Sequence, residues 1–496
     1  MARKPVPAAN PGRMTVRHYC QGIGDCHLLS FPKADGRPYW MLIDCGVHSS
    51  VTGGSAKIAA IVADIASQTR HIDVLVITHE HTDHVSGFLT AADQFAGFTV
   101  DAVWLAWTEN PADLQARQLD KFKSDALTAL QMASQHLSAA TTASPYVAAL
   151  HQGLDAVIGF NFGATGARVR AARDAGIALA HGNIRYLEPT DPPMIRDDLG
   201  LRIYVLGPPR DAKLLGLTER ASEMFGATAP TAPLTMALSG ACAASAGQPD
   251  ALDYGAPFDQ NDGTPLDAVA LASGDGAAAL IQFVQDHYSG REKPPLRPNP
   301  SRRNLAPTTA QDHDQSWRRI DHDWLGVSAD LALQLDSKTN NTSLVLAFEF
   351  ADSGRVLLFA ADAQIGNWLS WQDRSWQVGD KSVTGPDLLA RTVYYKVGHH
   401  GSHNATPQAK GLAQMVSPDL SAFVPTNAAD AAKVGWGQMP YGAILKALAS
   451  QCNGRVIRAD DQWLTGQGPG PAFATPSGSI KALGFKQNLW VELRLA

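Results

Sequence analysis

The stretch from Val74 to His84 constrains the fold of this 496-residue chain more than any other part of it. Val74 to Ile77 is an apolar run of the composition and length of a buried strand. The run stops abruptly in the polar residues Thr-His-Glu-His-Thr-Asp-His. Open α/β sheets place their binding sites beyond the carboxyl ends of their strands. We therefore expect an α/β fold with a polar site directly after this strand.

The polar residues after this run have side chains that bind transition metals. His79 and His81 are two positions apart, so in an extended segment they point to the same side. Asp83 and His84 follow at the turn and can reach a second point nearby. Imidazole nitrogens and carboxylate oxygens are the usual ligands of zinc and related metals. The motif therefore predicts ligands for two adjacent divalent metals, which together can hold an attacking water and a leaving oxygen.

Several segments, taken together, resemble a known family. The motif His79-X-His81-X-Asp83-His84 resembles the signature of the metallo-β-lactamase superfamily of metal-dependent hydrolases. Five further segments resemble, in the same order, those of the hydrolase domain of the competence protein ComEC: Gln21–Leu29, Leu42–Gly46, Asn340–Leu346, Leu357–Ala363 and Lys396–Ser402. The likeness extends over residues 14–100 and 325–460 and does not cover the middle of the chain.

This resemblance implies an α/β protein with the four-layer αββα sandwich of the superfamily. We expect the first half of the sandwich at residues 14–109 and the second half at 328–496. Residues 110–327 would then be a large, mainly helical insertion that also contains some core strands. Within it, residues 289–310 are rich in proline and arginine, a composition that indicates a surface loop.

The resemblance also implies a role for each residue of the site. The expected metal ligands come from both halves of the chain: His79, His81, Asp83, His84, Asp362 and His399. The first two would hold one metal and the next two the other, while Asp362 would bridge the pair. For the last ligand we favour His399, the first histidine after its strand, but His400 fits the motif equally.

Other residues are expected to act around the metals. Asp83 and His400 are also candidate catalytic residues, the latter through a hydrogen bond or a contact with substrate. Ser402 or His403 could steady or protonate the leaving oxygen, although both could equally serve only the structure of their loop. Asp44 would support the metal ligands from behind, because outer partners of this kind fix ligand orientation, or it could simply cap a tight turn.

Two positions depart from the family pattern. Relatives carry a histidine in an Asn…Tyr-Gly-His-Pro segment, where this chain has Met439. The third ligand of the first metal, commonly a histidine, has no clear counterpart either. Asn340, Asn341, a histidine of the middle region or water could fill that place. We therefore expect a modest affinity at the first metal site and a substrate choice that can differ from that of relatives.

The expected activity is that of a dinuclear hydrolase in which two Zn²⁺ or Mn²⁺ ions activate a bridging hydroxide. The resemblance favours a phosphodiester as substrate, in DNA or RNA, although a small phosphodiester would also fit. An acyl hydrolase of the lactonase, thioesterase or β-lactamase type is the second hypothesis, because one fold can host both chemistries. The third hypothesis is a metal-stabilised binding or regulatory protein with little turnover.

The net charge of −6 argues against a protein covered in positive charge for nucleic acid. A polyanionic substrate would have to be bound locally instead. The dense basic stretch lies in the loop at residues 289–310, where Arg297, Arg302 and Arg303 are the candidate substrate-binding residues. The alternative is that this stretch is only a solvated, proline-rich loop.

The five cysteines are odd in number and include no Cys-X-X-Cys pair, which favours buried reduced thiols. Reduced thiols suit the cytoplasm, where we expect the protein to reside. The first twelve residues lack the apolar core of a signal peptide, and no stretch has the length of a membrane span. We therefore expect a cytoplasmic protein without membrane contact, and its protein partners stay unknown.

Overall fold

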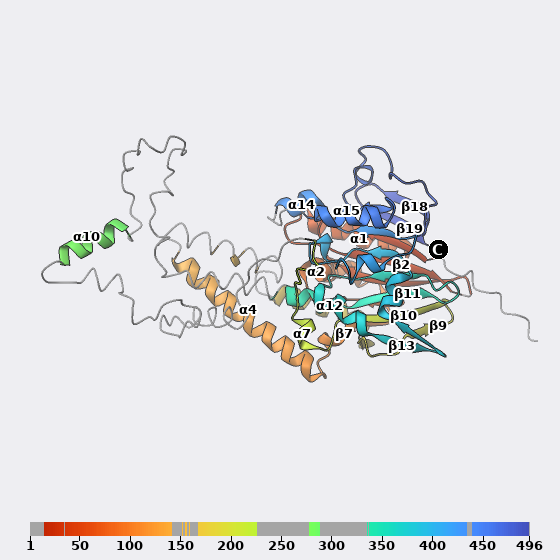
Figure 1. The fold of residues 1–496 in the computed structure, drawn as a ribbon, viewed down its shortest axis with the longest axis horizontal. Coiled ribbons are helices and arrows are strands. Elements are labelled where there is room, and N and C mark those ends of the chain that lie inside the picture. The colour runs from red at the N-terminus through yellow and green to blue at the C-terminus, as the bar shows by residue number, and fades with distance from the viewer. Residues whose placement is uncertain are drawn as a thin grey trace, which may run out of the picture. The chain divides into compact units, whose positions relative to one another are not determined.

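The computed structural model describes most of the chain: residues 14–33, 35–140, 151, 154–155, 158, 167–225, 277–287, 335, 337–433 and 439–495. Figure 1 draws the described helices and strands as ribbons. The chain divides into two compact units. The first unit comprises Met1–Lys121, Phe160–Ala229 and Asp336–Ala496. The second comprises Phe122–Gly159 and Pro230–Leu335.

The first unit contains two large sheets, and the motif lies on the sheet of eight strands. In order across this sheet the strands are β18 (Ile480–Lys486), β19 (Trp490–Leu495), β1 (Met14–Tyr19), β2 (Cys26–Pro32), β3 (Pro38–Cys45), β5 (Val74–Val76), β7 (Val103–Ala106) and β8 (Ile184–Leu187). The strands from β3 to β8 run parallel, and the others pair antiparallel. The apolar run at Val74 is thus a short strand with a parallel neighbour on either side.

The second sheet has seven strands, which come mainly from the C-terminal half of the chain. In order they are β17 (Val456–Arg458), β16 (Ser421–Val424), β15 (Thr392–Lys396), β12 (Val356–Phe359), β11 (Val345–Phe350), β10 (Leu201–Gly207) and β9 (Met194–Arg196). The strands from β17 to β12 run parallel. Two small ladders complete the strands: β4 (His71–Ile72) with β6 (Thr99–Val100), and β13 (Ser375–Val378) with β14 (Lys381–Thr384).

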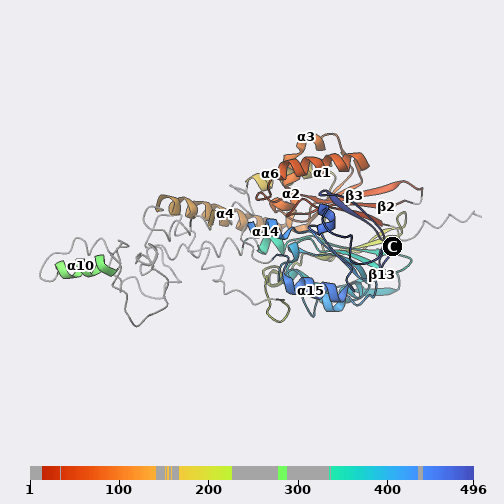
Figure 2. The ribbon, with the colours of Figure 1, turned by 90° about the horizontal axis from the view of Figure 1, so that it is seen from above.

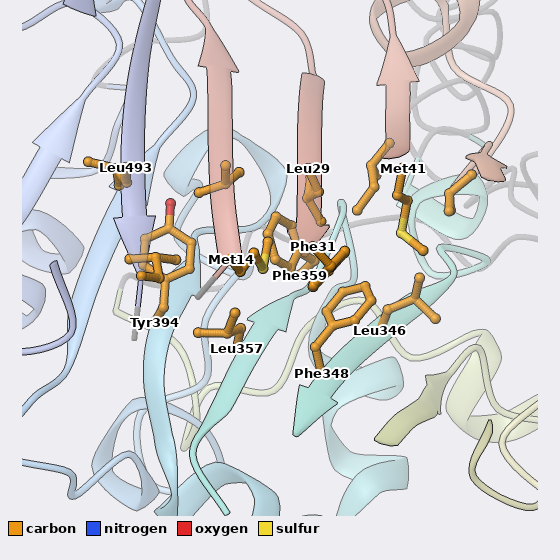
Figure 3. Close-up of a cluster of buried hydrophobic side chains, with 14 of the residues drawn as sticks. Met14, Leu29, Phe31, Met41, Leu346, Phe348, Leu357, Phe359, Tyr394 and Leu493 are labelled. Atoms are coloured by element: carbon orange, nitrogen blue, oxygen red, sulfur yellow. The ribbon is translucent and has the colours of Figure 1, made fainter. Parts of the chain in front are cut away.

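The two large sheets face each other across an apolar layer. Met14, Phe31 and Met41 from the first sheet meet Phe348 and Phe359 from the second, and all five are almost fully buried (Figure 3). Residues of this layer alternate along their strands with residues that face the helices, because successive side chains of a strand point to opposite faces. Burial of both faces explains the continuous apolar runs in the parallel strands.

Helices cover the outer face of each sheet (Figure 2). The first sheet packs against α1 (Gly54–Gln68), α2 (Thr82–Thr90), α3 (Ala92–Phe95) and α6 (Ala167–Ala178). The second packs against α12 (Ile365–Ser370), α13 (Gly385–Ala390) and α15 (Gly442–Gln451). Two further short helices are α7 (Ala212–Leu215) and α14 (Ala428–Lys433). The layers are therefore helix, sheet, sheet and helix, which confirms the expected αββα sandwich.

The described part of the middle region, residues 110–327, contains helices as well as the core strands β8, β9 and β10. A long helix, α4 (Leu114–Ala140), begins three residues after Pro111, and α10 (Ala277–His287) belongs to the second unit. The loop at residues 289–310, with Arg297, Arg302 and Arg303, lies outside the described residues. Within the part of the chain that the structure describes, no helix is both long and apolar enough to cross a membrane. The four described cysteines are free thiols.

Candidate metal centre

The motif leaves the first sheet at Thr78, one residue after the last sheet hydrogen bond of its strand. The Ile77 N–H still donates to the Trp104 carbonyl oxygen on β7, at 3.0 Å. Both the N–H and the hydroxyl of Thr78 then donate to Asp44, at 2.8 and 2.6 Å. Asp44 follows the apolar part of β3, the parallel neighbour of β5. The chain is therefore turned out of the sheet at the expected carboxyl edge.

Four side chains meet at this edge as a buried cluster. Asp83 and His84 lie in the first turn of α2, Asp362 follows β12, and His400 lies in the single 3₁₀ turn His399–Gly401 after β15. One nitrogen or oxygen from each of the four lies within 4.8 Å of the others. All four side chains are buried. Because β12 and β15 are parallel neighbours, their carboxyl ends bring Asp362 and His400 together.

The distances within this cluster are short. His400 Nε2 lies 2.7 Å from Asp83 Oδ2 and 3.4 Å from Asp362 Oδ2. His84 Nε2 lies 3.1 Å from Asp362 Oδ2 and 3.8 Å from Asp83 Oδ2. Each carboxylate is thus close to both imidazoles, and each sheet contributes one half of the set.

His79 and His81 lie beside this cluster. Their rings contact each other, with Nε2 of His79 3.1 Å from Nδ1 of His81. The ring centroid of His79 is 4.2 Å from that of His84. Among the described residues, no group of three or more ligand-type side chains includes His79 or His81. The structure therefore places this pair next to the cluster without adding a third protein ligand for a first metal.

The two consecutive histidines point in different directions. Both have positive φ, +40° at His399 and +56° at His400, so the turn is left-handed at each residue. His400 faces the carboxylates, whereas His399 Nε2 lies 3.1 Å from Asn340 Nδ2 and its Nδ1 lies 2.7 Å from Ser402 Oγ. The backbone N–H of His399 donates to Asp362 at 3.0 Å.

Asp44 supports His84 from behind. Its Oδ2 lies 2.8 Å from His84 Nδ1, and the side chain is fully buried. An Nδ1–H donated to Asp44 leaves Nε2 of His84 as the nitrogen that faces Asp83 and Asp362. This is the arrangement by which a carboxylate sets the tautomer and orientation of a metal-binding histidine.

The charges of the cluster are strongly coupled. Burial alone would raise the pKa of Asp83, but the nearby His84 and His400 lower that pKa well below its usual range. The pKa of Asp362 is lowered in the same way against the effect of burial. Conversely, burial would lower the pKa of His84, yet the carboxylates of Asp362 and Asp83 raise it well above 6.5. Both carboxyl groups are therefore ionised at neutral pH.

The donor set fits divalent metal ions. It combines two imidazoles with two ionised carboxylates, the ligand types of zinc and manganese sites. His84 Nε2 is buried and makes no hydrogen bond of normal geometry, although it faces two carboxylates. A buried nitrogen of this kind normally has a partner, and a metal ion would supply it.

The remaining expected site residues lie around the loop after β15. Ser402 Oγ donates to Asn404 Oδ1 at 2.8 Å, in addition to its contact with His399. His403 is partly exposed, with Nε2 3.4 Å from Glu219 Oε1. The Tyr441 N–H, two residues after Met439, donates to the Gly401 carbonyl oxygen, so this segment adjoins the loop.

Three charged residues near the site had no role assigned from the sequence. Asp25 and Lys396 form an ion pair in which both side chains are 1% exposed. Lys396 stands in an otherwise apolar strand, which is a signal that could have identified it. Arg173 on α6 donates to Glu80 of the motif at 2.6 Å. Nothing in the local sequence signals that contact, because the two residues are far apart along the chain.

Comparison with known proteins gives independent support for this part of the fold. The family model described as "Metallo-beta-lactamase superfamily" matches residues 35–120. The matched segment includes β3, β5, β7 and the complete motif from His79 to His84. No curated protein and no solved structure matches the chain.

Proposed function

We propose that this protein is a hydrolase that depends on two divalent metal ions. The observation on which the proposal rests is the buried cluster of Asp83, His84, Asp362 and His400, to which both sheets contribute. The match to the metallo-beta-lactamase superfamily, whose members are generally hydrolytic and bind divalent metals, supports it.

We assign His400, instead of His399, as the histidine ligand from the second sheet. His400 Nε2 lies within 3.4 Å of both carboxylates, whereas the ring nitrogens of His399 lie beside Asn340 and Ser402. Asp83, His84 and His400 would then hold one metal and His79 with His81 the other. Asp362 lies close to both His84 and His400 and would help to hold the first of these metals, while its role as a bridge to the other metal stays the expectation from the sequence.

The buried charges require at least one divalent ion and are compatible with two. Asp25, Asp44, Asp83 and Asp362 contribute four carboxylates, and Lys396 contributes one ammonium group, so with neutral imidazoles the net charge is −3. One divalent ion would leave this buried region negative. Two ions would bring it to +1, a charge that suits an anionic substrate such as a phosphodiester. Buried charges without compensation are costly, so at least one ion is needed, and the adjacent His79 and His81 offer ligands for a second.

Bound metals would supply Lewis-acid activation of water and stabilisation of the negative charge that develops in the transition state. The chain's own residues prepare the site for this chemistry. Asp44 fixes the ring of His84, and the ionised Asp83 and Asp362 present oxygen ligands in a buried region. Burial lowers the pKa of His399 to about 4, so this histidine is neutral at pH 7 and adds no charge to the site.

We favour a phosphodiester in nucleic acid as the substrate. The ComEC-like segments support this choice, as does the positive charge expected for the loaded site. His403 is partly exposed and remains the candidate for contact with the leaving oxygen. Met439 stands where relatives have a histidine, so contacts to the substrate at that point would differ.

The test compares two Asp→Asn variants by metal analysis and hydrolysis. Asp362→Asn removes the carboxylate expected to bridge the metals, so metal content should fall from about two equivalents to one or fewer, and hydrolysis of bis-p-nitrophenyl phosphate should fall more than about 100-fold. Asp64→Asn is the matched control, because Asp64 is a partly buried carboxylate that binds Arg17 and Tyr19 instead. Wild-type metal content and rate in folded Asp362→Asn protein would refute the proposal.

A panel of substrates tests the chemical class. Bis-p-nitrophenyl phosphate, single-stranded DNA, RNA, a β-lactam and a lactone would each be assayed with zinc and with manganese. Cleavage of the lactam or lactone without phosphodiester cleavage would favour acyl hydrolysis. Metal-loaded protein that is silent on every substrate would instead support a binding protein.

A further inference from the structure

Five polar side chains form a buried chain behind the metal centre: Asp25, His27, His18, Lys396 and Tyr394. None is more than 1% exposed. Lys396 donates to Asp25, and His27 Nε2 lies 3.5 Å from Asp25 Oδ2. The Nδ1 atoms of His27 and His18 are 2.9 Å apart, and His18 Nε2 contacts the hydroxyl of Tyr394.

This chain of polar side chains crosses from one sheet to the other. His18 and His27 belong to β1 and β2 of the first sheet, and Asp25 directly precedes β2. Tyr394 and Lys396 belong to β15 of the second sheet. The two contacts between the sheets, Lys396 with Asp25 and Tyr394 with His18, occur beside an apolar layer in which Tyr394 is one of the packed side chains (Figure 3).

The ion pair between Asp25 and Lys396 connects the two halves of the metal centre. The N–H of Asp25 donates to the carbonyl oxygen of Asp83 at 3.0 Å, and Asp25 Oδ2 lies 4.0 Å from His84 Nδ1. Lys396 is the last residue of β15, four residues before His400. A rigid link between Asp25 and Lys396 therefore holds the peptide of Asp83 at a fixed place relative to the strand that positions His400.

A role in stability alone does not explain this arrangement. Buried ion pairs are often no better for stability than apolar side chains of the same volume. One oxygen of this pair, Asp25 Oδ1, is buried and has no hydrogen-bond partner. Asp25, Lys396, His27 and Thr78 also line a small internal cavity instead of a closely packed core. An apolar pair would fill this space better, so the polar residues indicate another use.

We propose that Asp25 and Lys396 are positioning residues, whose ion pair sets the spacing between the ligands that the two sheets contribute. This inference rests on the proposed two-metal function, because it concerns the same ligands. Outer partners that orient metal ligands typically change metal affinity by about 10- to 100-fold when they are removed.

Two single substitutions separate position from charge. Asp25→Asn removes a negative charge from the region and Lys396→Met removes a positive one, so a purely electrostatic role would weaken cobalt binding in the first variant and strengthen it in the second. A positioning role weakens binding in both, by about 10-fold or more. The readouts are Co²⁺ affinity by titration calorimetry and the visible absorption bands of bound Co²⁺, which report ligand geometry and should change in both variants.

Glu349→Gln is the matched control. Glu349 is a buried carboxylate of the second sheet, to which Lys396 also belongs. It is bound to the Tyr204 hydroxyl at 2.6 Å and to Arg391 at 2.5 Å. It pairs with Val356 at the start of β12, the end of that strand away from Asp362. Its substitution should lower the melting temperature while leaving cobalt affinity and spectrum unchanged.

The double variant Asp25→Asn with Lys396→Met removes the pair without changing the net charge. It is measured in every case, because one of the single variants could fail to fold. Weaker binding and an altered spectrum in it support the positioning role. Affinities that shift in opposite directions in the single variants, or wild-type affinity and spectrum in the folded double variant, overturn that role. Wild-type protein that binds no cobalt would refute the metal centre itself, which is a different outcome.

Discussion

Two histidines of the metal centre, His84 and His400, carry protons that a bound metal must displace. The carboxylates of Asp362 and Asp83 raise the pKa of His84, and the same two carboxylates raise the pKa of His400, in both cases against the effect of burial. In the metal-free protein these imidazoles are therefore protonated to a higher pH than an ordinary histidine. Metal binding requires neutral imidazoles, so it must release these protons.

This coupling predicts a pH-dependent stabilisation by metal. Histidines with a raised folded pKa stabilise the metal-free protein fully below 6.5, and that contribution is lost as the pH rises through the folded pKa. Zinc competes with the same protons, so its affinity increases over this range. We expect the rise in melting temperature on adding zinc to be larger at about pH 8 than at about pH 6.

Thermal scans with and without zinc at both pH values check this prediction. Asp362→Asn, which removes the carboxylate shared by His84 and His400, serves as the control and should show a smaller zinc-dependent rise than the wild-type protein, because it holds one equivalent of metal or fewer. An equal rise at both pH values in the wild-type protein would contradict the expected proton release.

Within the metal centre, the sequence predicts the types of the ligand residues well and the orientation of their side chains poorly. The spacing of His79, His81, Asp83 and His84 after an apolar strand already indicates their joint position at a strand end. The choice between His399 and His400 depends on two consecutive left-handed residues, with φ of +40° and +56°. Spacing along the chain contains no information on such a turn, so the motif does not decide which of the two histidines is the metal ligand.

Among the secondary-structure elements, α6 has the most direct effect on the motif. It packs against α2, and its Gly176 lies so close to Ile77 and Phe88 that a Cβ atom there would come within 2.9 Å of both side chains. From this helix, Arg173 Nη1 donates to Glu80 at 2.6 Å and to Glu109 at 2.8 Å. The helix thereby ties the motif to the segment that follows β7.

We predict that Arg173→Met destabilises the protein by roughly 3–5 kcal/mol, because it removes the guanidinium from two largely buried carboxylates. Urea unfolding of the metal-free protein measures this change. Arg170→Met on the same helix is the control: Arg170 and its partner Asp120 are both exposed, so the loss should stay below about 1 kcal/mol. Equal losses in the two variants would show that α6 does not restrain the motif through Arg173.

The helices and strands can be predicted from the local sequence pattern to different degrees. Ile58, Ile61, Val62 and Ile65 have helical spacing in the sequence, and all four are buried on α1. The alternating C-terminal segment predicts a strand, and β19 is one. The sequence does not indicate that β18 pairs outside it, because the β18 strand has mostly exposed residues and no strict alternation.

At the scale of the whole molecule, the metal ligands come from distant parts of the chain that only the sandwich brings together. Resemblance of short segments on both sides of the middle region was enough to predict this, because parallel strands align their carboxyl ends. The cross-sheet chain from Asp25 to Tyr394 was not predictable, since it depends on how the two sheets face each other. The basic loop with Arg297, Arg302 and Arg303 lies outside the described residues, and its role stays a prediction.

The substrate hypothesis makes its strongest prediction about that loop. The net charge of −6 leaves a nucleic acid without broad attraction to this protein, so its phosphates must be bound locally. If the loop does this, changing Arg297, Arg302 and Arg303 together to glutamine should raise KM for single-stranded DNA. It should also flatten the salt dependence of binding, by about 0.7 in the log–log slope for each arginine that contacts a phosphate.

Small substrates distinguish this effect from damage to the metal centre. Hydrolysis of bis-p-nitrophenyl phosphate needs only the metals and their ligands, so the triple variant should cleave it at the wild-type rate. The matched control neutralises three exposed basic residues elsewhere: Arg37, Arg168 and Lys381. Equal increases in KM for DNA in both triple variants would mean that overall charge, and not this loop, attracts the polymer. Unchanged KM and salt slope in the loop variant would leave the loop without a part in substrate binding, and a small phosphodiester would then become the better candidate substrate.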